Sequence, residues 1–354
     1  MIDLKHYGYT ETTPTPPGSI PGRITEHHRD KYTVITQYGE AMASLKGSFH
    51  HNAEGRDDFP CVGDFVLLQH NQSGDSRITR LLPRTSKFSR ADFSGHAAGY
   101  VKTIREQVVA ANFDYVFILS SLNQDFNVSR ILRYLTQAKQ SGGHPVIILT
   151  KADLTDDYEL ALVELIAAEP EVPVCVVSSH TGYGLAALSE FLQPGKTAVF
   201  LGMSGVGKSS LLNALMDEDV MAVKAIREDD SRGRHTTTHR QLFMLPSGAM
   251  IIDTPGMREL GLFDVGDAIS TSFADIEALF DNCKFNDCGH VTEPGCAIRS
   301  ALADGSLPRE RWDRYQAQTR ENKFADDKAA YIREKNESYK SIALYSKAQK
   351  AKKR

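Results

Sequence analysis

A glycine-rich octapeptide at residues 202–209 limits the folds open to this chain more than any other segment. It reads GMSGVGKS, fits the pattern G-x-x-x-x-G-K-[ST], and lies between the apolar run TAVFL and the helical pattern SSLLNALM. Such a loop places backbone amides and a helix N-terminus around phosphate oxygens. There Lys208 would neutralise the β- and γ-phosphates, and the hydroxyl of Ser209 would bind Mg²⁺. We therefore expect a nucleoside triphosphate site made by Gly202, Met203, Ser204, Gly205, Val206, Gly207, Lys208, Ser209 and Ser210.

The sequence around this loop alternates between apolar, β-rich runs and helical stretches. From residue 113 onward the runs YVFILSSL, PVIILTKADL, VPVCVVSS and TAVFL are separated by segments with helical periodicity. Strands buried on both faces with intervening helices are typical of a parallel sheet in an α/β domain. Two further runs, RQLFML and AMIIDTPG, bring the expected sheet to about six strands.

A second loop that could serve a bound phosphate follows the run AMIID. It reads Asp253-Thr254-Pro255-Gly256. An Asp at a strand end can hold Mg²⁺ through water, and the amide of Gly256 can sense a γ-phosphate. The same residues are also good turn formers, so a plain strand-to-turn connection is the alternative.

Residues that could select the base follow two other strands. The segment 150–153 reads Thr150-Lys151-Ala152-Asp153, and the Asp153 carboxylate can accept from both guanine N1–H and the exocyclic amine, a pair that adenine lacks. The Lys151 stem can lie along the purine face, and the amides of Ser178 and Ser179 can reach the base oxygen. This predicts GTP over ATP, because the wrong base leaves buried polar groups unpaired. A helix N-cap by Asp153 is the alternative.

The N-terminal third has a different pattern. Residues 1–30 include a proline-rich stretch, which favours an extended lead-in before the first packed element. From about 31 to 100, short β-rich pieces separated by turn residues predict a small barrel of the oligonucleotide-binding (OB) type. Basic residues gather near its end, where they could contact nucleic acid or be ordinary solvated charges: Arg77, Arg80, Arg84, Lys87 and Arg90.

Four potential metal ligands are concentrated in a turn-rich segment near the C-terminus. Cys283, Cys288, His290 and Cys296 offer three thiols and one imidazole within 14 residues. A Cys₃His set with no open position argues for one structural Zn²⁺, and unrelated buried thiols are the alternative. The remaining two of the five cysteines lie in predicted strands and are expected in the core. An odd number of cysteines is a poor disulfide framework and suits a reducing cytosol.

Charge and hydropathy further limit the class of protein that this chain can be. The chain has 41 Lys and Arg against 45 Asp and Glu, so it is not basic all over, although local patches remain open. No apolar run approaches the roughly 18 residues of a spanning helix, and the first residues lack a basic-then-apolar signal pattern. We therefore expect a cytoplasmic protein without a membrane segment.

The loops resemble the G motifs of translation-factor-like GTPases, but their order is rotated, because TKAD and SSH precede GMSGVGKS and DTPG. Only the chain connection changes, so all these loops can still lie on one edge of one sheet. A barrel precedes these rotated motifs, GRHTTT lies among them at 233–238, and the Cys/His cluster follows them. In this combination the chain resembles the ribosome small subunit-dependent GTPase A family (RsgA, also called YjeQ or YloQ). That resemblance implies a circularly permuted P-loop GTPase domain of the α/β class at 101–265, between an OB-type barrel at 31–100 and a zinc-binding helical domain with a basic tail at 266–354.

The same resemblance implies a function. Members of this family bind the 30S ribosomal subunit and its 16S rRNA late in maturation, and the subunit stimulates hydrolysis of GTP to GDP and Pi; a monomer is expected. Lys208 and His235 are the catalytic candidates, with His235 orienting the attacking water or, alternatively, contacting RNA from a mobile loop. Thr237 is expected to reach Mg²⁺, although the register among residues 236–238 is open. Met257 stands where many GTPases have Gln, which predicts slow intrinsic turnover.

One position departs from the usual pattern of the base-reading segment. Thr150 stands where many GTPases have Asn and has fewer hydrogen-bonding groups, so we expect weaker nucleotide affinity with the selectivity of Asp153 intact.

Two other functions remain open. The first is a nucleotide-gated RNA-binding module with little intrinsic turnover. The second is a P-loop ATPase that acts on another nucleic acid.

Overall fold

The structure is a computed structural model that describes residues 1–10, 14–28, 30–47, 49, 57–92, 105–123, 126–155, 158–218, 240–253, 273–285 and 288–319. It divides into two compact units. The first combines Met1–Arg90 with Glu106–Leu260, and the second combines Ala91–Arg105 with Gly261–Arg354. Each unit has a hydrophobic core of its own.

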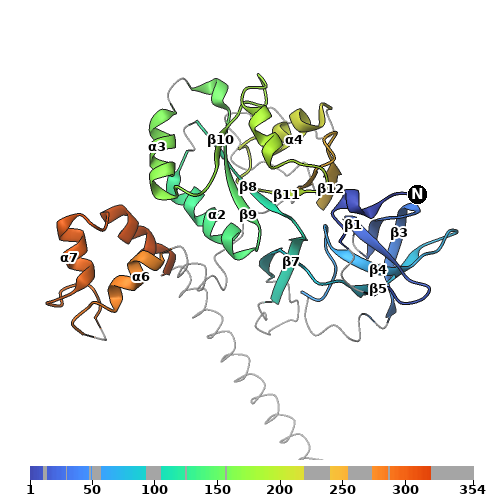
Figure 1. The fold of residues 1–354 in the computed structure, drawn as a ribbon, viewed down its shortest axis with the longest axis horizontal. Helices are drawn as coiled ribbons and strands as arrows, with labels where there is room; N and C mark the ends of the chain where they lie inside the picture. Colours follow the sequence, from blue (N-terminus) through green and yellow to red (C-terminus); the bar gives the residue numbers. More distant parts are fainter. Residues whose placement is uncertain are drawn as a thin grey trace, which may run out of the picture. The chain divides into compact units, whose positions relative to one another are not determined.

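The first unit begins with a closed five-stranded barrel, drawn in blue in Figure 1. Its strands are β1 (Ile20–His28), β2 (Lys31–Thr36), β3 (Gly39–Leu45), β4 (Phe65–Gln69) and β5 (Ser76–Leu81). They pair in the order β1-β2-β3-β5-β4, and β4 returns to β1. Ile24, Val34 and Val66 are buried in its core. Gly22 is required there, because a Cβ at this position would lie 2.6 Å from Val34 Cγ1.

The barrel begins earlier than the expected boundary at residue 31. Strand β1 lies inside the expected extended lead-in, and the 3₁₀ helix η1 (Leu4–Tyr7) precedes it with Asp3 as its N-cap. Pro21 is the second residue of β1, a place near a strand end where the missing N–H of proline is tolerated. A proline-rich sequence therefore does not exclude a strand at this position.

The rest of the first unit contains an α/β sheet. The described strands of this sheet are β8 (Tyr115–Ser121), β9 (His144–Thr150), β10 (Val174–Val176), β11 (Thr197–Leu201), β12 (Arg240–Met244) and β13 (Met250–Asp253). Their order is β10-β9-β8-β11-β13-β12, and all neighbours are parallel except β12 and β13. This confirms the α/β fold class and, within the described residues, the expected six strands.

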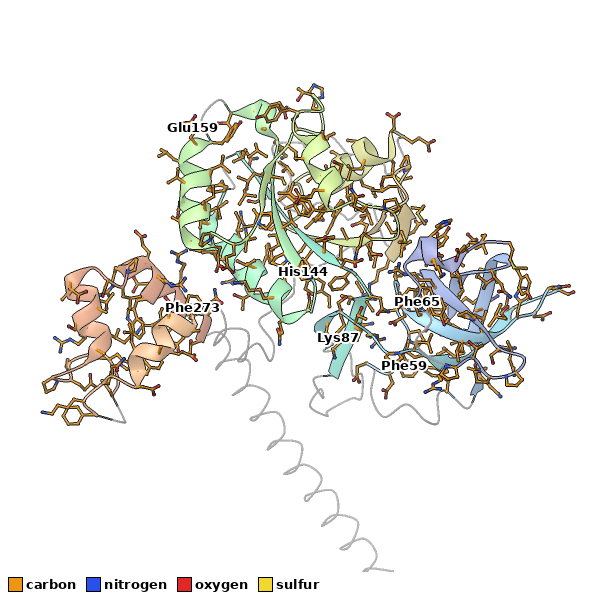
Figure 2. The ribbon with its side chains drawn as sticks, in the orientation of Figure 1. Phe59, Phe65, Lys87, His144, Glu159 and Phe273 are labelled. Carbon is orange, nitrogen blue, oxygen red and sulfur yellow. The ribbon has the colours of Figure 1, made fainter. Side chains whose placement is uncertain are left out.

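Helices cover both faces of this sheet. They are α2 (Val128–Gln140), α3 (Glu159–Ala168) and α4 (Lys208–Met216), with the 3₁₀ helices η2 (Ala152–Leu154) and η3 (Leu185–Glu190). Val116 and Ile118 of β8 belong to the same apolar cluster as Ile131 of α2, whereas the alternate residue Phe117 belongs to a second cluster with Leu211 of α4. Side chains that alternate in this way bury both faces of a parallel strand. Figure 2 draws the side chains on the ribbon and labels His144, the first residue of β9.

The barrel and the α/β sheet are joined edge to edge. Strand β1 pairs antiparallel with β12 through Glu26 and Gln241 and through His27 and Arg240. The pairing makes one continuous 11-stranded sheet. Between the barrel and β8 along the chain, β6 (Lys87–Asp92) and β7 (Arg105–Ala111) form a separate two-stranded sheet.

The second unit is small and helical. It contains α6 (Ala274–Phe280), α7 (Ala297–Asp304) and a helical stretch at residues 309–319. Ile276, Ile298 and Trp312 are buried together with the sulfur-bearing Cys296. Arg311 donates two hydrogen bonds of 2.7 Å to the carboxylate of Asp275, which ties this last stretch to α6.

Candidate nucleotide and metal sites

The octapeptide 202–209 adopts the strand, loop and helix that its sequence predicts. Strand β11 is buried along its whole length, and α4 begins at Lys208. Gly205 and Gly207 have φ of 80° and 99°, in the region that side chains rarely adopt. A Cβ on Gly202 would lie 2.7 Å from the carbonyl oxygen of Leu119, so the loop lies tightly against β8. This backbone can bring its amides and the N-terminus of α4 close to phosphate oxygens.

Lys208 folds back onto its own loop. Its Nζ donates to the carbonyl oxygens of Gly202 at 2.7 Å and Met203 at 2.6 Å. Asp253 is the last residue of β13 and is buried; burial raises the pKa of its carboxyl, while the positive charge of Lys208 lowers it. The ammonium and the carboxylate therefore lie at the same end of neighbouring parallel strands. The oxygen ligands of Asp253 and the Ser209 hydroxyl suit Mg²⁺, which prefers oxygen.

The candidate base-reading segment, residues 150–153, is held by hydrogen bonds to the loop after β10. Asp153 lies in η2, and its Oδ1 accepts from Ser178 Oγ at 2.5 Å. Ser178 Oγ in turn accepts from the amides of His180 and Thr181, each at 3.2 Å. The N-cap of α3 is Tyr158, so Asp153 does not cap that helix. The fixed carboxylate can present its second oxygen to a ligand.

The expected role of the Ser178 amide requires a correction. That amide donates to the carbonyl oxygen of Tyr183 at 2.9 Å, within its own loop. Ser178 therefore contributes through its hydroxyl, and of the two expected amides Ser179 is the candidate donor to a base oxygen. The sequence pattern does not reveal this, because the turn that brings Tyr183 back to Ser178 depends on Gly182 and Gly184 at φ of 79° and 72°.

Thr150 joins the base-reading segment directly to the phosphate loop. This residue ends β9, is 1% exposed, and its Oγ1 donates to the carbonyl oxygen of Val206. Gly207 lies beside it, since a Cβ there would be 3.7 Å from Thr150 Oγ1. The Thr150 hydroxyl thus contacts the phosphate loop, although Thr has fewer hydrogen-bonding groups than Asn. Asp153 and Lys208 lie at the same sheet edge, because β9, β8 and β11 are parallel neighbours.

Three predicted residues lie outside the described part of the chain. They are His235, Thr237 and Gly256, and the same holds for Met257.

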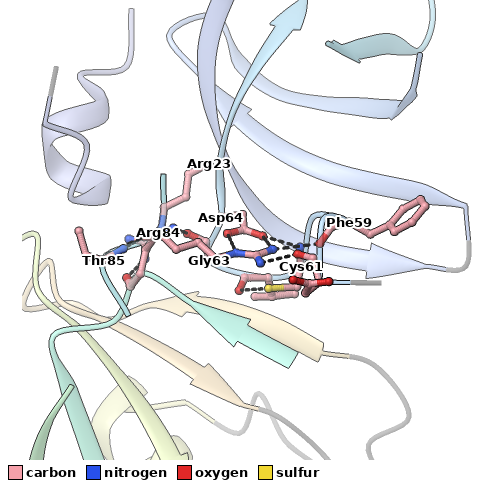
Figure 3. A network of polar contacts seen from close by, with 10 residues as sticks. Arg23, Phe59, Cys61, Gly63, Asp64, Arg84 and Thr85 are labelled. Carbon is pink, nitrogen blue, oxygen red and sulfur yellow. Dashed lines mark hydrogen bonds and ion pairs between the residues drawn. The ribbon is translucent and has the colours of Figure 1, made fainter. Parts of the chain in front are cut away.

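One member of the predicted basic cluster near the barrel, Arg84, forms an internal hydrogen-bond network. Arg84 is largely buried and donates from Nε and Nη2 to Asp64, and from Nη1 and Nη2 to the carbonyl oxygens of Asp57 and Phe59, as Figure 3 shows. Arg84 therefore holds the loop before β4 and is not an ordinary solvated charge. Cys61, in the same loop, is buried as expected, and Cys175 is half-buried in β10.

The four predicted metal ligands come together in the second unit. The ligand atoms of Cys283, Cys288, His290 and Cys296 all lie within 4.8 Å of one another. His290 Nδ1 is 3.6 Å from Cys283 Sγ and 3.5 Å from Cys296 Sγ. Ligand atoms at such separations can surround one tetrahedral ion with bonds of about 2.0 to 2.3 Å. Three thiolates and an imidazole fit one structural Zn²⁺.

Glu293 holds the turn that presents His290, a role that the sequence analysis does not assign. Its carboxylate accepts from the amides of Gly289 and Val291 at 2.9 Å and of Thr292 at 2.8 Å. These backbone hydrogen bonds lower the pKa of Glu293 to about 2. His290 has φ of 58°, and its ring stacks on Phe280 with centroids 4.5 Å apart. An acidic residue inside a turn-rich ligand segment is the signal that could have indicated this carboxylate.

The P-loop, the base-reading segment bonded to it and the rotated strand order define a circularly permuted P-loop GTPase. Comparisons with known proteins agree, since a family model described as RsgA GTPase matches residues 81–263. The chain belongs to the RsgA GTPase family and is a GTP hydrolase.

Relatives and solved structures resemble the chain over most of its length. RsgA 2 of Lactiplantibacillus plantarum, named a small ribosomal subunit biogenesis GTPase, is 45% identical over 327 residues and covers 91% of this chain and 90% of its own. RsgA 1 of Listeria innocua, with the same description, is 43% identical over 345 residues, with 96% and 95% covered. YjeQ from Thermotoga maritima has a TM-score of 0.62 at 27% identity, covering 84% and 96%. YloQ, titled a circularly permuted GTPase, has a TM-score of 0.58 at 24% identity, covering 88% and 96%.

No helix within the described residues is long and apolar enough to cross a membrane.

Proposed function

We propose that this chain binds the small ribosomal subunit during late maturation and hydrolyses GTP there, with turnover stimulated by the subunit. The relatives named as small ribosomal subunit biogenesis GTPases support the partner. The 16S rRNA as the surface contacted, a monomeric state and a cytoplasmic location belong to the same proposal. The domain bounds also belong to this proposal: a barrel precedes a GTPase domain at 101–265, and a zinc-binding domain follows at 266–354.

The proposed roles of the site residues follow from the chemistry of the triphosphate. The loop amides of 202–207 and Lys208 bind the β- and γ-phosphates, and Lys208 leaves its two loop carbonyls to do so. Ser209 and Asp253 would hold Mg²⁺, which supplies charge neutralisation at the phosphates when bound. Positive charge fixed around the γ-phosphate stabilises the charge that develops as its bond to the leaving oxygen breaks. Gly256, Thr237 and His235 would complete the site around the γ-phosphate.

The base-reading roles rest on the fixed Asp153 carboxylate. Ser178 holds one oxygen of the carboxylate, and the remaining lone pairs of its two oxygens can accept from guanine N1–H and its amine. Lys151, at φ of 60°, precedes it, and Ala152 N donates to Val177 O at 3.2 Å, which ties this segment to the loop of Ser178 and Ser179. The hydrogen bond from Thr150 to Val206 is the observation that supports these roles most directly, because it joins the candidate base-reading segment to the candidate phosphate loop.

Steady-state release of phosphate tests this function. GTP turnover by the full chain is compared in buffer, with 30S subunits and with 50S subunits, and ATP is competed against GTP. We expect stimulation by 30S subunits only, with ATP a poor competitor. Stimulation by 50S subunits alone would overturn the ribosomal partner, absence of turnover under all conditions would favour a nucleotide-gated RNA-binding module, and effective competition by ATP would favour an ATPase.

A further inference from the structure

Arg23 of β1 is a buried cation, and its guanidinium group lies among atoms of the α/β sheet. It is 1% exposed, and burial lowers its pKa to about 10, so it stays charged at neutral pH. Its Nη1 donates to Thr197 Oγ1 at 2.9 Å and to Met250 Sδ at 3.3 Å. The barrel thus places a charged fork at the start of two strands of the neighbouring sheet.

These two strands lead directly to the nucleotide site. Thr197 is the first residue of β11, whose other end continues into the phosphate loop, and Met250 is the first residue of β13, whose last residue is Asp253. At about 3.3 Å per residue, β11 spans about 13 Å and β13 about 10 Å. Short strands buried in a close-packed core transmit displacements with little slack. Arg23 therefore holds the rear ends of the two strands that carry the candidate Lys208 loop and Mg²⁺ ligand.

The other hydrogen bonds of Arg23 go to the junction between barrel and sheet. Nε donates to Gly63 O at 3.2 Å, Nη1 also to Tyr7 O at 2.7 Å, and Nη2 to Asn112 O at 2.7 Å. Gly63 has φ of 91°, and a Cβ there would lie 2.0 Å from the carbonyl oxygen of Ala111. Backbone therefore packs directly on backbone at this junction, and a side chain at residue 63 would not fit there.

Asn112 extends this network towards the surface. Its Nδ2 donates to Gly63 O at 3.2 Å, and its Oδ1 accepts from the amide of Thr85 at 2.9 Å. The neighbouring Ser86 exchanges two hydrogen bonds with the backbone of Phe113, at 2.6 and 2.7 Å. Figure 3 shows Arg23, Gly63 and Thr85 in this network, beside the Arg84 and Asp64 pair.

We propose that Arg23 is a positioning residue for the nucleotide site, which couples the barrel to the conformation of the phosphate loop. The inference rests on the proposed function, since the coupling is measured through binding of the small ribosomal subunit. The linkage runs from Thr85 through Asn112 and Arg23 to Thr197 and Met250. A buried guanidinium is costly to desolvate, and such a group can be retained for a defined arrangement rather than for stability.

The test compares the affinity of the full chain for 30S subunits in the presence of a non-hydrolysable GTP analogue and of GDP. The ratio of the two affinities measures the coupling, and bound subunits must change the preference of the chain for the GTP analogue over GDP by the same factor. The variants are Thr197→Val, which keeps the shape but removes the acceptor of Arg23, and Arg23→Met. Thr36→Val is the matched control, because Thr36 is a buried threonine whose hydroxyl bonds Gly39 O within the barrel.

We expect Thr197→Val and Arg23→Met to lower this ratio by about fivefold or more, while their affinity for nucleotide without subunits stays within about twofold of the parent and Thr36→Val keeps the full ratio. If Arg23→Met does not fold, Thr197→Val decides alone. A parent ratio well above one that both variants retain would overturn the inference and leave the proposed function standing. A parent chain that does not bind 30S subunits would overturn both.

Discussion

Thr150 shows how one hydroxyl can contact the phosphate loop where many GTPases have the larger side chain of Asn. It is buried at the end of β9 and donates to the Val206 carbonyl of the phosphate loop. From sequence alone, Thr in place of Asn is expected to be a loss, because Thr has one donor and no amide. Only the packed structure reveals that the contact to the phosphate loop is kept.

Replacing Thr150 tests this contact. Thr150→Val keeps the shape but leaves the Val206 carbonyl without this donor, so we expect GTP affinity to fall about tenfold, equivalent to about 1.4 kcal/mol. Thr150→Ser keeps the hydroxyl and should stay within about threefold of the parent. Titration with a fluorescent GTP analogue measures both. Equal affinity of the valine variant and the parent would show that the hydrogen bond does not support the site.

At the scale of elements, local patterns are read well from sequence and long-range contacts are not. The strand, loop and helix at 197–216 and the ligands at 283–296 are contiguous, so their residue types reveal their geometry. Strand β1 was not predicted because it contains Pro21 and follows a proline-rich stretch, and Arg23 bonds to residues 40, 89 and 174 positions away. Such contacts depend on which elements the fold brings together.

The metal ligands make a prediction for the second unit. Its core is small, so we expect Zn²⁺ to supply much of its folding free energy, as in small metal-stabilised domains. The purified chain should contain about one Zn²⁺, and removal by a strong chelator should unfold α6 and α7, seen as faster amide hydrogen exchange over 273–319. Cys288→Ser should lose the ion, whereas Cys175→Ser, in β10, should keep it. Unchanged exchange after complete removal of Zn²⁺ would show that the ion is not structural.

At the scale of the whole molecule, the rotated order of loops changes the chain connection but not the site. The candidate base-reading residues are encoded some fifty positions before the phosphate loop but lie at the same sheet edge, because β9, β8 and β11 are parallel neighbours in one sheet. The sequence predicted this edge, since every loop concerned follows a strand. It could not place the barrel, whose β1 extends the same sheet through β12.

The most direct measurement of this shared site is the affinity of Asp153→Asn for GTP and for xanthosine triphosphate. Xanthine has an oxygen in place of the guanine amine, so an amide at residue 153 can donate where the carboxylate accepted. We predict that GTP affinity falls about a hundredfold or more while xanthosine triphosphate gains affinity, because two charge-assisted hydrogen bonds are lost and a complementary pair is made. Equal changes for both nucleotides, or no change, would contradict the claim that Asp153 and Lys208 hold one nucleotide.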